Sequence, residues 1–88
     1  MDPLRIAICD DRPEEREKLL CLLKQTLILT VSTQFGSSEE LLEVFRPGDF
    51  DLLLMDIYMN GMTGVEAVKR IREMDEQIPI AFTTTSTD

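Results

Sequence analysis

The sequence predicts an α/β fold in which helices cover both faces of a doubly wound parallel sheet. Short apolar runs typical of strands alternate with longer segments of helical spacing. The runs at 4–9 and 52–55 are apolar at almost every position, as in strands that are buried on both faces of a parallel sheet. At 88 residues the chain has room for one domain, residues 1–88.

The first half of the chain predicts a strand, a helix and a second strand. Residues 4–9 form a mostly apolar run that ends in a polar turn at 10–13. Pro13 suits a first helical turn, the glutamates after it favour the positive end of the helix dipole, and leucines recur on one face as far as Leu27. Residues 30–35 alternate as a half-buried or edge strand would.

The second half predicts a helix and then a buried strand. Ser37 and Glu40 have the spacing of a capping box ahead of an apolar helical face. The run 52–55 is too short for a helix between its flanking turn residues, so we expect a strand with Asp56 at its carboxyl end.

Two more elements follow the loop after Asp56. Apolar residues from Val65 to Met74 take helical spacing, and residues 78–83 have the composition of a strand with a proline near its start. The predicted order is therefore βαβαβαβ.

Charge and hydropathy exclude several classes of function. The chain has 17 acidic and 9 basic residues, a net charge of -8, which argues against unaided binding to nucleic acid or to an anionic membrane. It has no apolar run of membrane-spanning length and no signal-peptide pattern, so we expect a cytoplasmic protein. Cys9 and Cys21 lack metal or redox spacing and are expected to be buried or half-buried packing residues.

Acidic residues follow the first and third predicted strands. If the second crossover passes back over the first strand, these strands are neighbours and Asp10, Asp11 and Asp56 meet at one edge of the sheet. Clustered carboxylates repel one another, and a hard cation with oxygen ligands relieves the repulsion. The sequence therefore predicts a magnesium site in which one aspartate can act as a nucleophile in phosphoryl transfer.

Three segments carry a resemblance to a known family. They are IAICDD at 6–11, LLLMDIYMNGMTG at 52–64 and IPIAFTT at 78–84. Together they resemble the leading signatures of response-regulator receiver domains, and the resemblance spans the whole chain. It implies a flavodoxin-like (CheY-like) fold.

The resemblance also implies a role for each site residue. Asp56 corresponds to the phosphoacceptor, and Asp11 and Asp56 to direct magnesium ligands. Asp10 would act on the ion largely through water, and the backbone carbonyl of Tyr58 would ligate it. Thr84 aligns with the family's switch hydroxyl at the end of the fourth strand.

Two minor departures and one serious departure from the family pattern are informative. Asn60 and Thr63 replace a usual proline and acid, as in receivers that precede a LytTR-type DNA-binding domain. The family continues through a helix, a fifth strand ending in a phosphoryl-contacting lysine and a last helix, whereas no lysine follows Lys69 here. We therefore expect an incomplete receiver with an exposed apolar edge at 80–82, which predicts a homodimer or a swapped assembly.

The leading function is a phosphoacceptor switch rather than an enzyme. The chain contains no histidine, so the phosphoryl donor would be a separate sensor histidine kinase, and a C-terminal DNA-binding output domain would control transcription. One alternative is a receiver-shaped interaction module that is not phosphorylated. Another is a phosphohydrolase of the haloacid-dehalogenase kind, but Arg12 stands where that family has its second acid. Taken alone, the pair Asp10 and Asp11 also fits a simple helix N-cap.

Overall fold

The computed structural model describes residues 2–26 and 30–83. It has the predicted βαβαβαβ order. The elements are β1 (Leu4–Cys9), α1 (Pro13–Lys24), β2 (Thr30–Phe35), α2 (Ser38–Val44), β3 (Leu52–Asp56), α3 (Gly64–Met74) and β4 (Ile80–Thr83).

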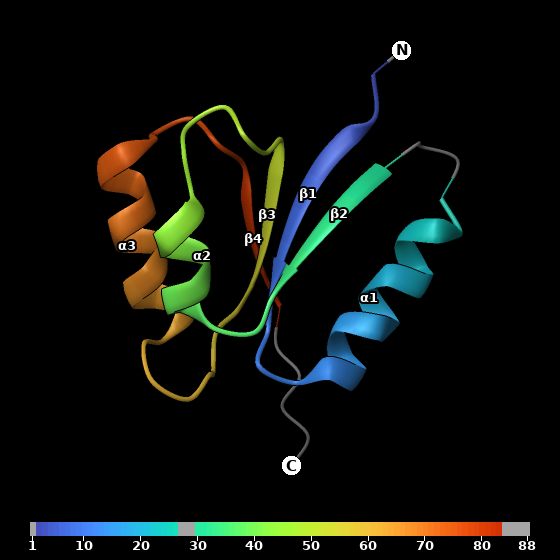
Figure 1. The fold of residues 1–88 in the computed structure, drawn as a ribbon, viewed down its shortest axis with the longest axis horizontal. Coiled ribbons are helices and arrows are strands. Elements are labelled where there is room, and N and C mark those ends of the chain that lie inside the picture. The colour runs from blue at the N-terminus through green and yellow to red at the C-terminus, as the bar shows by residue number, and fades with distance from the viewer. Residues whose placement is uncertain (1, 27–29, 84–88) are drawn as a thin grey trace.

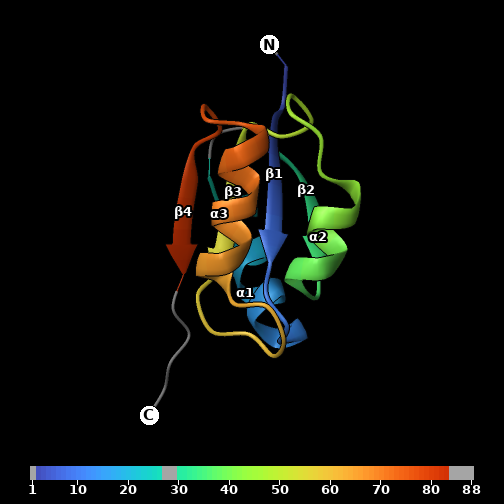
Figure 2. The same ribbon diagram turned by 90° about the vertical axis from the view of Figure 1, so that its left-hand side faces the viewer.

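The strands form one parallel sheet in the order β2-β1-β3-β4. The chain winds outward from β1 to β2 and then passes back over β1 to β3. Because of this reversal, α1 covers one face of the sheet and α2 and α3 cover the other (Figures 1 and 2). The order matches a doubly wound sheet of the flavodoxin-like type, which confirms the predicted fold class.

The main core lies between the sheet and the α2–α3 layer. Strand residues such as Ala7, Leu53 and Met55 are completely buried there against Leu41 and Ile71 from the helices. Each fully buried side chain of leucine or isoleucine size contributes about 1.5–3 kcal/mol to stability. Three phenylalanine rings extend this core, with centroids 6.2 Å apart for Phe35 and Phe50 and 6.4 Å apart for Phe45 and Phe50.

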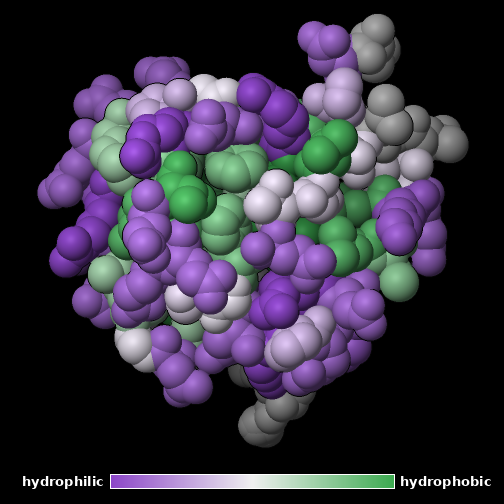
Figure 3. Space-filling model, viewed as in Figure 1, coloured by the Kyte–Doolittle hydropathy of each residue, from purple (hydrophilic) through white to green (hydrophobic). Residues whose placement is uncertain are grey.

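The layer formed by α1 is packed less tightly. Ile6 and Ile8 of β1 are buried, but none of the residues of α1 is fully buried, and Leu22 is 60% exposed. On the face seen in Figure 3, hydrophilic side chains surround the apolar ones. Leu20, one of the leucines that recur on the predicted helical face, is half-buried, whereas Leu27 lies outside the described residues.

Some local predictions were wrong. The fourth strand begins at Ile80 rather than at residue 78, because Pro79 has no N–H for a ladder bond. The Ser37 hydroxyl does accept the N–H of Glu40, but the Glu40 carboxylate accepts the N–H of Gly36, so the capping box is incomplete. Cys21 is exposed, not buried or half-buried.

The helices were compared with the length and hydropathy that a membrane-spanning helix needs. Within 2–26 and 30–83, no helix is both long enough and apolar enough to cross a membrane.

Candidate functional site

The carboxyl ends of β1 and β3 lie side by side and carry the acidic residues. Asp10, Asp11 and Asp56 each offer one carboxylate oxygen, and these oxygens all lie within 4.8 Å of one another. Asp10 and Asp56 are completely buried and Asp11 is half-buried. The structure thus brings together the three carboxylates that the sequence predicted to converge.

Asp10 is held by the turn between β1 and α1. Its Oδ1 accepts the N–H of Arg12 at 2.9 Å, and its own carbonyl accepts Nη1 of Arg16 at 2.7 Å. Its Oδ2 is buried and has no hydrogen-bond partner among the described residues. The N-cap of α1 is Arg12, without a side-chain cap bond, so the interpretation of the acidic pair as a simple N-cap was wrong.

Asp56 shows the same division between its two oxygens. Its Oδ1 accepts the N–H of Tyr58 at 3.4 Å, a long contact. Its Oδ2 is buried and unpartnered among the described residues. Tyr58 is 69% exposed, and its contact with the site is made by its backbone N–H.

Asp11 connects the cluster to the loop after β3. Its Oδ2 accepts the N–H of Asn60 at 3.1 Å. The loop then closes onto the start of α3, where the N–H of Gly64 donates to the carbonyl of Ile57 at 3.1 Å. A Cβ on Gly64 would overlap the carbonyl oxygen of Asp56, so glycine is required for this close approach.

Sequence reasoning missed the residues that hold this loop. The contacts of Asn60 and Gly64 with the acidic site join residues whose proximity depends on the tertiary fold. The only signal in the sequence was a glycine at the expected start of a helix after an acidic strand end, a pattern that several local structures produce.

Burial is the main influence on the pKa values of the acidic groups at the site, and repulsion between carboxylates adds to it at Asp56. Burial raises the pKa of Asp10, and the Arg12 N–H partly offsets this. Burial also raises the pKa of Asp56, the charge of Asp10 raises it further, and the Tyr58 N–H partly offsets both. Burial, with added repulsion from Asp10 and Asp56, raises the pKa of the Cys9 thiol to about 12, so Cys9 offers no thiolate at neutral pH.

The donor set fits a hard divalent cation. All three residues of the cluster present carboxylate oxygens, and two buried oxygens lack a hydrogen-bond partner among the described residues. Oxygen ligands of this kind suit Mg²⁺, which retains several waters in protein sites. The predicted switch residue Thr84 lies outside the described residues; Thr83 is the register partner of Asp56 on β4.

Comparisons with known proteins agree with this geometry. The family model of the response regulator receiver domain matches residues 6–88. The sensory transduction protein LytT of Oceanobacillus iheyensis is 31% identical over 83 residues, which cover 92% of this chain and 34% of that protein. The chain therefore spans about a third of the length of this relative.

Solved structures give the same result. TrrA of Thermotoga maritima in complex with Mg²⁺-BeF matches with a TM-score of 0.84 at 31% identity, over 96% of this chain and 71% of that one. A complex of the histidine kinase ThkA with TrrA matches with a TM-score of 0.77 at 30% identity, over 97% of this chain and 72% of that one. With the doubly wound sheet and the acidic cluster, these matches show that the chain belongs to the response regulator receiver domain family of two-component systems.

Proposed function

We propose that this chain accepts a phosphoryl group on Asp56 from a partner histidine kinase in a Mg²⁺-dependent reaction. The observation that carries the proposal is the cluster of Asp10, Asp11 and Asp56, with two buried carboxylate oxygens that have no partner among the described residues. A structural ion-pair network would leave no such oxygens, because buried carboxylates are normally paired.

The residues that would hold Mg²⁺ are the carboxylates of Asp11 and Asp56 and the backbone carbonyl of Tyr58, with Asp10 acting through water. Bound there, the ion would neutralise charge on the phosphoryl oxygens. Support comes from TrrA, which has been solved in complex with Mg²⁺-BeF.

Asp56 would act as the nucleophile. Its carboxylate oxygen forms a bond to the phosphorus of a phosphohistidine, the phosphorus–nitrogen bond breaks, and the released imidazole takes a proton from solvent. The Tyr58 N–H donates to Oδ1, and Oδ2 has no hydrogen-bond partner within 2–26 and 30–83. The Thr84 hydroxyl would donate to a phosphoryl oxygen. The chain would act as a phosphoacceptor and not as an enzyme with a separate substrate.

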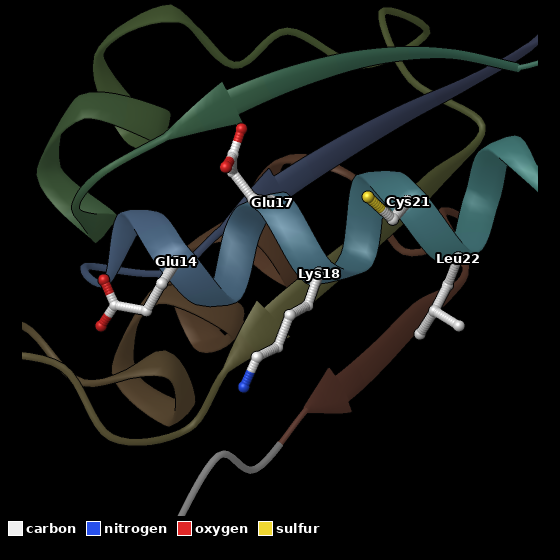
Figure 4. Close-up of a pocket in the computed structure, with 5 residues that line it drawn as sticks. All are labelled: Glu14, Glu17, Lys18, Cys21 and Leu22. Atoms are coloured by element: carbon white, nitrogen blue, oxygen red, sulfur yellow. The ribbon is translucent and has the colours of Figure 1, made fainter.

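We propose that the donor histidine lies on a sensor kinase; these 88 residues contain no histidine. We propose that the kinase docks near α1, where Glu14, Glu17, Lys18, Cys21 and Leu22 line a shallow hollow on a single helix (Figure 4). We propose an output in transcription through a C-terminal DNA-binding domain, in a cytoplasmic protein. The similarity to the transcriptional regulatory protein YdfI of Bacillus subtilis, which is 30% identical, supports the transcriptional part.

An interaction between two copies of the chain is a second proposal. Among the described residues β4 is an outer strand of the sheet, and its Phe82 is 45% exposed. Such an edge favours pairing with a second chain, as a homodimer or a swapped assembly. Light scattering that gives a monodisperse monomer would remove this proposal.

The test of phosphorylation is the intact mass after incubation with acetyl phosphate and Mg²⁺. The parent is expected to gain one phosphoryl group and Asp56→Asn none. No gain in a folded parent would instead favour the alternative of an interaction module that is not phosphorylated.

A further inference from the structure

Glu39 lies outside the acidic cluster and contacts the loop that follows Asp56. It belongs to the first turn of α2, and its Oε2 accepts the N–H of Met62 at 3.2 Å. A Cβ on Gly61 would lie 3.1 Å from this same oxygen, and Gly61 has a φ of 81°. The loop backbone therefore approaches the carboxylate closely, at a position that favours glycine.

Every second amide from residue 58 to residue 64 is held by an oxygen acceptor. The N–H of Tyr58 donates to Asp56 and that of Asn60 to Asp11. The N–H of Met62 donates to Glu39, and that of Gly64 to a carbonyl within the loop. Glu39 is thus the acceptor in this series that comes from α2.

Asp11 and Glu39 both accept a loop amide, but only Asp11 would also bind the cation. Under the proposed function the carboxylate of Asp11 would serve both the cation and the Asn60 amide. Glu39 is exposed on α2 and is not part of the cluster, so its bond to the loop is independent of the ion. It can hold the loop whether or not the cluster is loaded.

We infer that Glu39 is a positioning residue that fixes the 57–63 loop, and with it the backbone of Tyr58 and the carboxylate of Asp11, for Mg²⁺ binding. This inference rests on the proposed function. Groups that orient metal ligands from outside the site alter affinity by about 10–100-fold when they are removed. Because a single hydrogen bond to a loop is involved, we expect an effect of about tenfold.

Two conservative variants separate positioning from simple charge. Glu39→Gln keeps an oxygen acceptor of the same reach but removes the negative charge. Glu39→Asp keeps the charge but is one methylene shorter. Positioning predicts that Glu39→Asp weakens Mg²⁺ binding about tenfold and that Glu39→Gln stays within about twofold of the parent, whereas long-range attraction predicts the reverse order.

Mg²⁺ titration can be followed by the fluorescence of Tyr58. It is the only tyrosine in a chain without tryptophan, and it is two residues from Asp56. Glu43→Gln, on the same helix and exposed, is the matched control and should leave affinity unchanged. Hydrogen exchange of the Met62 amide in metal-free protein is the second readout, and it should be faster in Glu39→Asp than in Glu39→Gln.

The outcomes are distinct. A parent that binds Mg²⁺ while Glu39→Asp binds it equally well would overturn the inference and leave the proposed function standing. A loss confined to Glu39→Gln would overturn it in favour of a charge effect. A folded parent that gives no Mg²⁺ response would overturn the proposed function itself, and the metal role of Glu39 with it.

Discussion

Asp56→Asn is expected to stabilise the metal-free protein, although it removes the proposed phosphoacceptor. Asp10, Asp11 and Asp56 hold carboxylate oxygens within 4.8 Å of one another. At that separation and an effective dielectric constant of about 20, two unit charges repel by about 3 kcal/mol. Each charge is spread over two oxygens and Asp11 is partly exposed to screening solvent, so we expect a net gain of about 1–2 kcal/mol.

The assay is thermal unfolding followed by circular dichroism in a chelating buffer at neutral pH. A gain of this size in a domain of this length corresponds to a rise of roughly 5–15 °C in Tm. Asp49→Asn, in an exposed loop, removes one negative charge at a distance from the cluster and is the control. A Tm that is unchanged or lowered in Asp56→Asn would refute the view that repulsion in the cluster costs stability.

Three further predictions concern pH and the loop. Folding raises the pKa of Asp10 and that of Asp56, so the folded state binds more protons than the unfolded state, and the stability of the metal-free protein should rise as pH falls from neutral through these pKa values. Urea unfolding over a pH series measures this, and a stability that falls instead would contradict the prediction. Gly64→Ala should cost about 2–3 kcal/mol in urea unfolding, because its Cβ would overlap the Asp56 carbonyl, and a neutral result would show that α3 can shift. Thr63→Ala removes the hydroxyl that accepts the Glu66 N–H at 3.2 Å and should cost about 1 kcal/mol in the same assay, with Thr63→Ser retaining most of the stability.

The convergence of the acidic residues could be predicted from the sequence on one condition, that the second crossover passes back over the first strand. Strand periodicity places the acidic residues at strand ends, whereas crossover rules fix the hand of each connection and not the strand order. The runs that became β1 and β3 are apolar enough to occupy the middle of the sheet, and Asp10 and Asp56 directly follow or end them. Once β1 and β3 are neighbours in a parallel sheet, their carboxyl ends share one edge. No side-chain detail was needed for this step.

The anchors of the loop could not be predicted in this way. Glu39 and Met62 are 23 residues apart, and Asp11 and Asn60 are 49 apart. Each contact depends on how α2 and the loop pack against the sheet, which no local pattern encodes. The missed capping box of α3 has a different cause: Thr63 and Glu66 carry its signature, but Thr63 was interpreted only as a departure from the family loop.

A proton, an amide and a cation should all relieve the same repulsion in the acidic cluster, so their effects on stability should not add. Mg²⁺ at a hundredfold excess over its Kd would stabilise the parent by about 2.7 kcal/mol. In Asp56→Asn one carboxylate ligand and much of the repulsion are already gone, so the ion should add far less. If Mg²⁺ raised the Tm of Asp56→Asn as much as that of the parent, the ion would be binding elsewhere, and the cluster would not be the magnesium site.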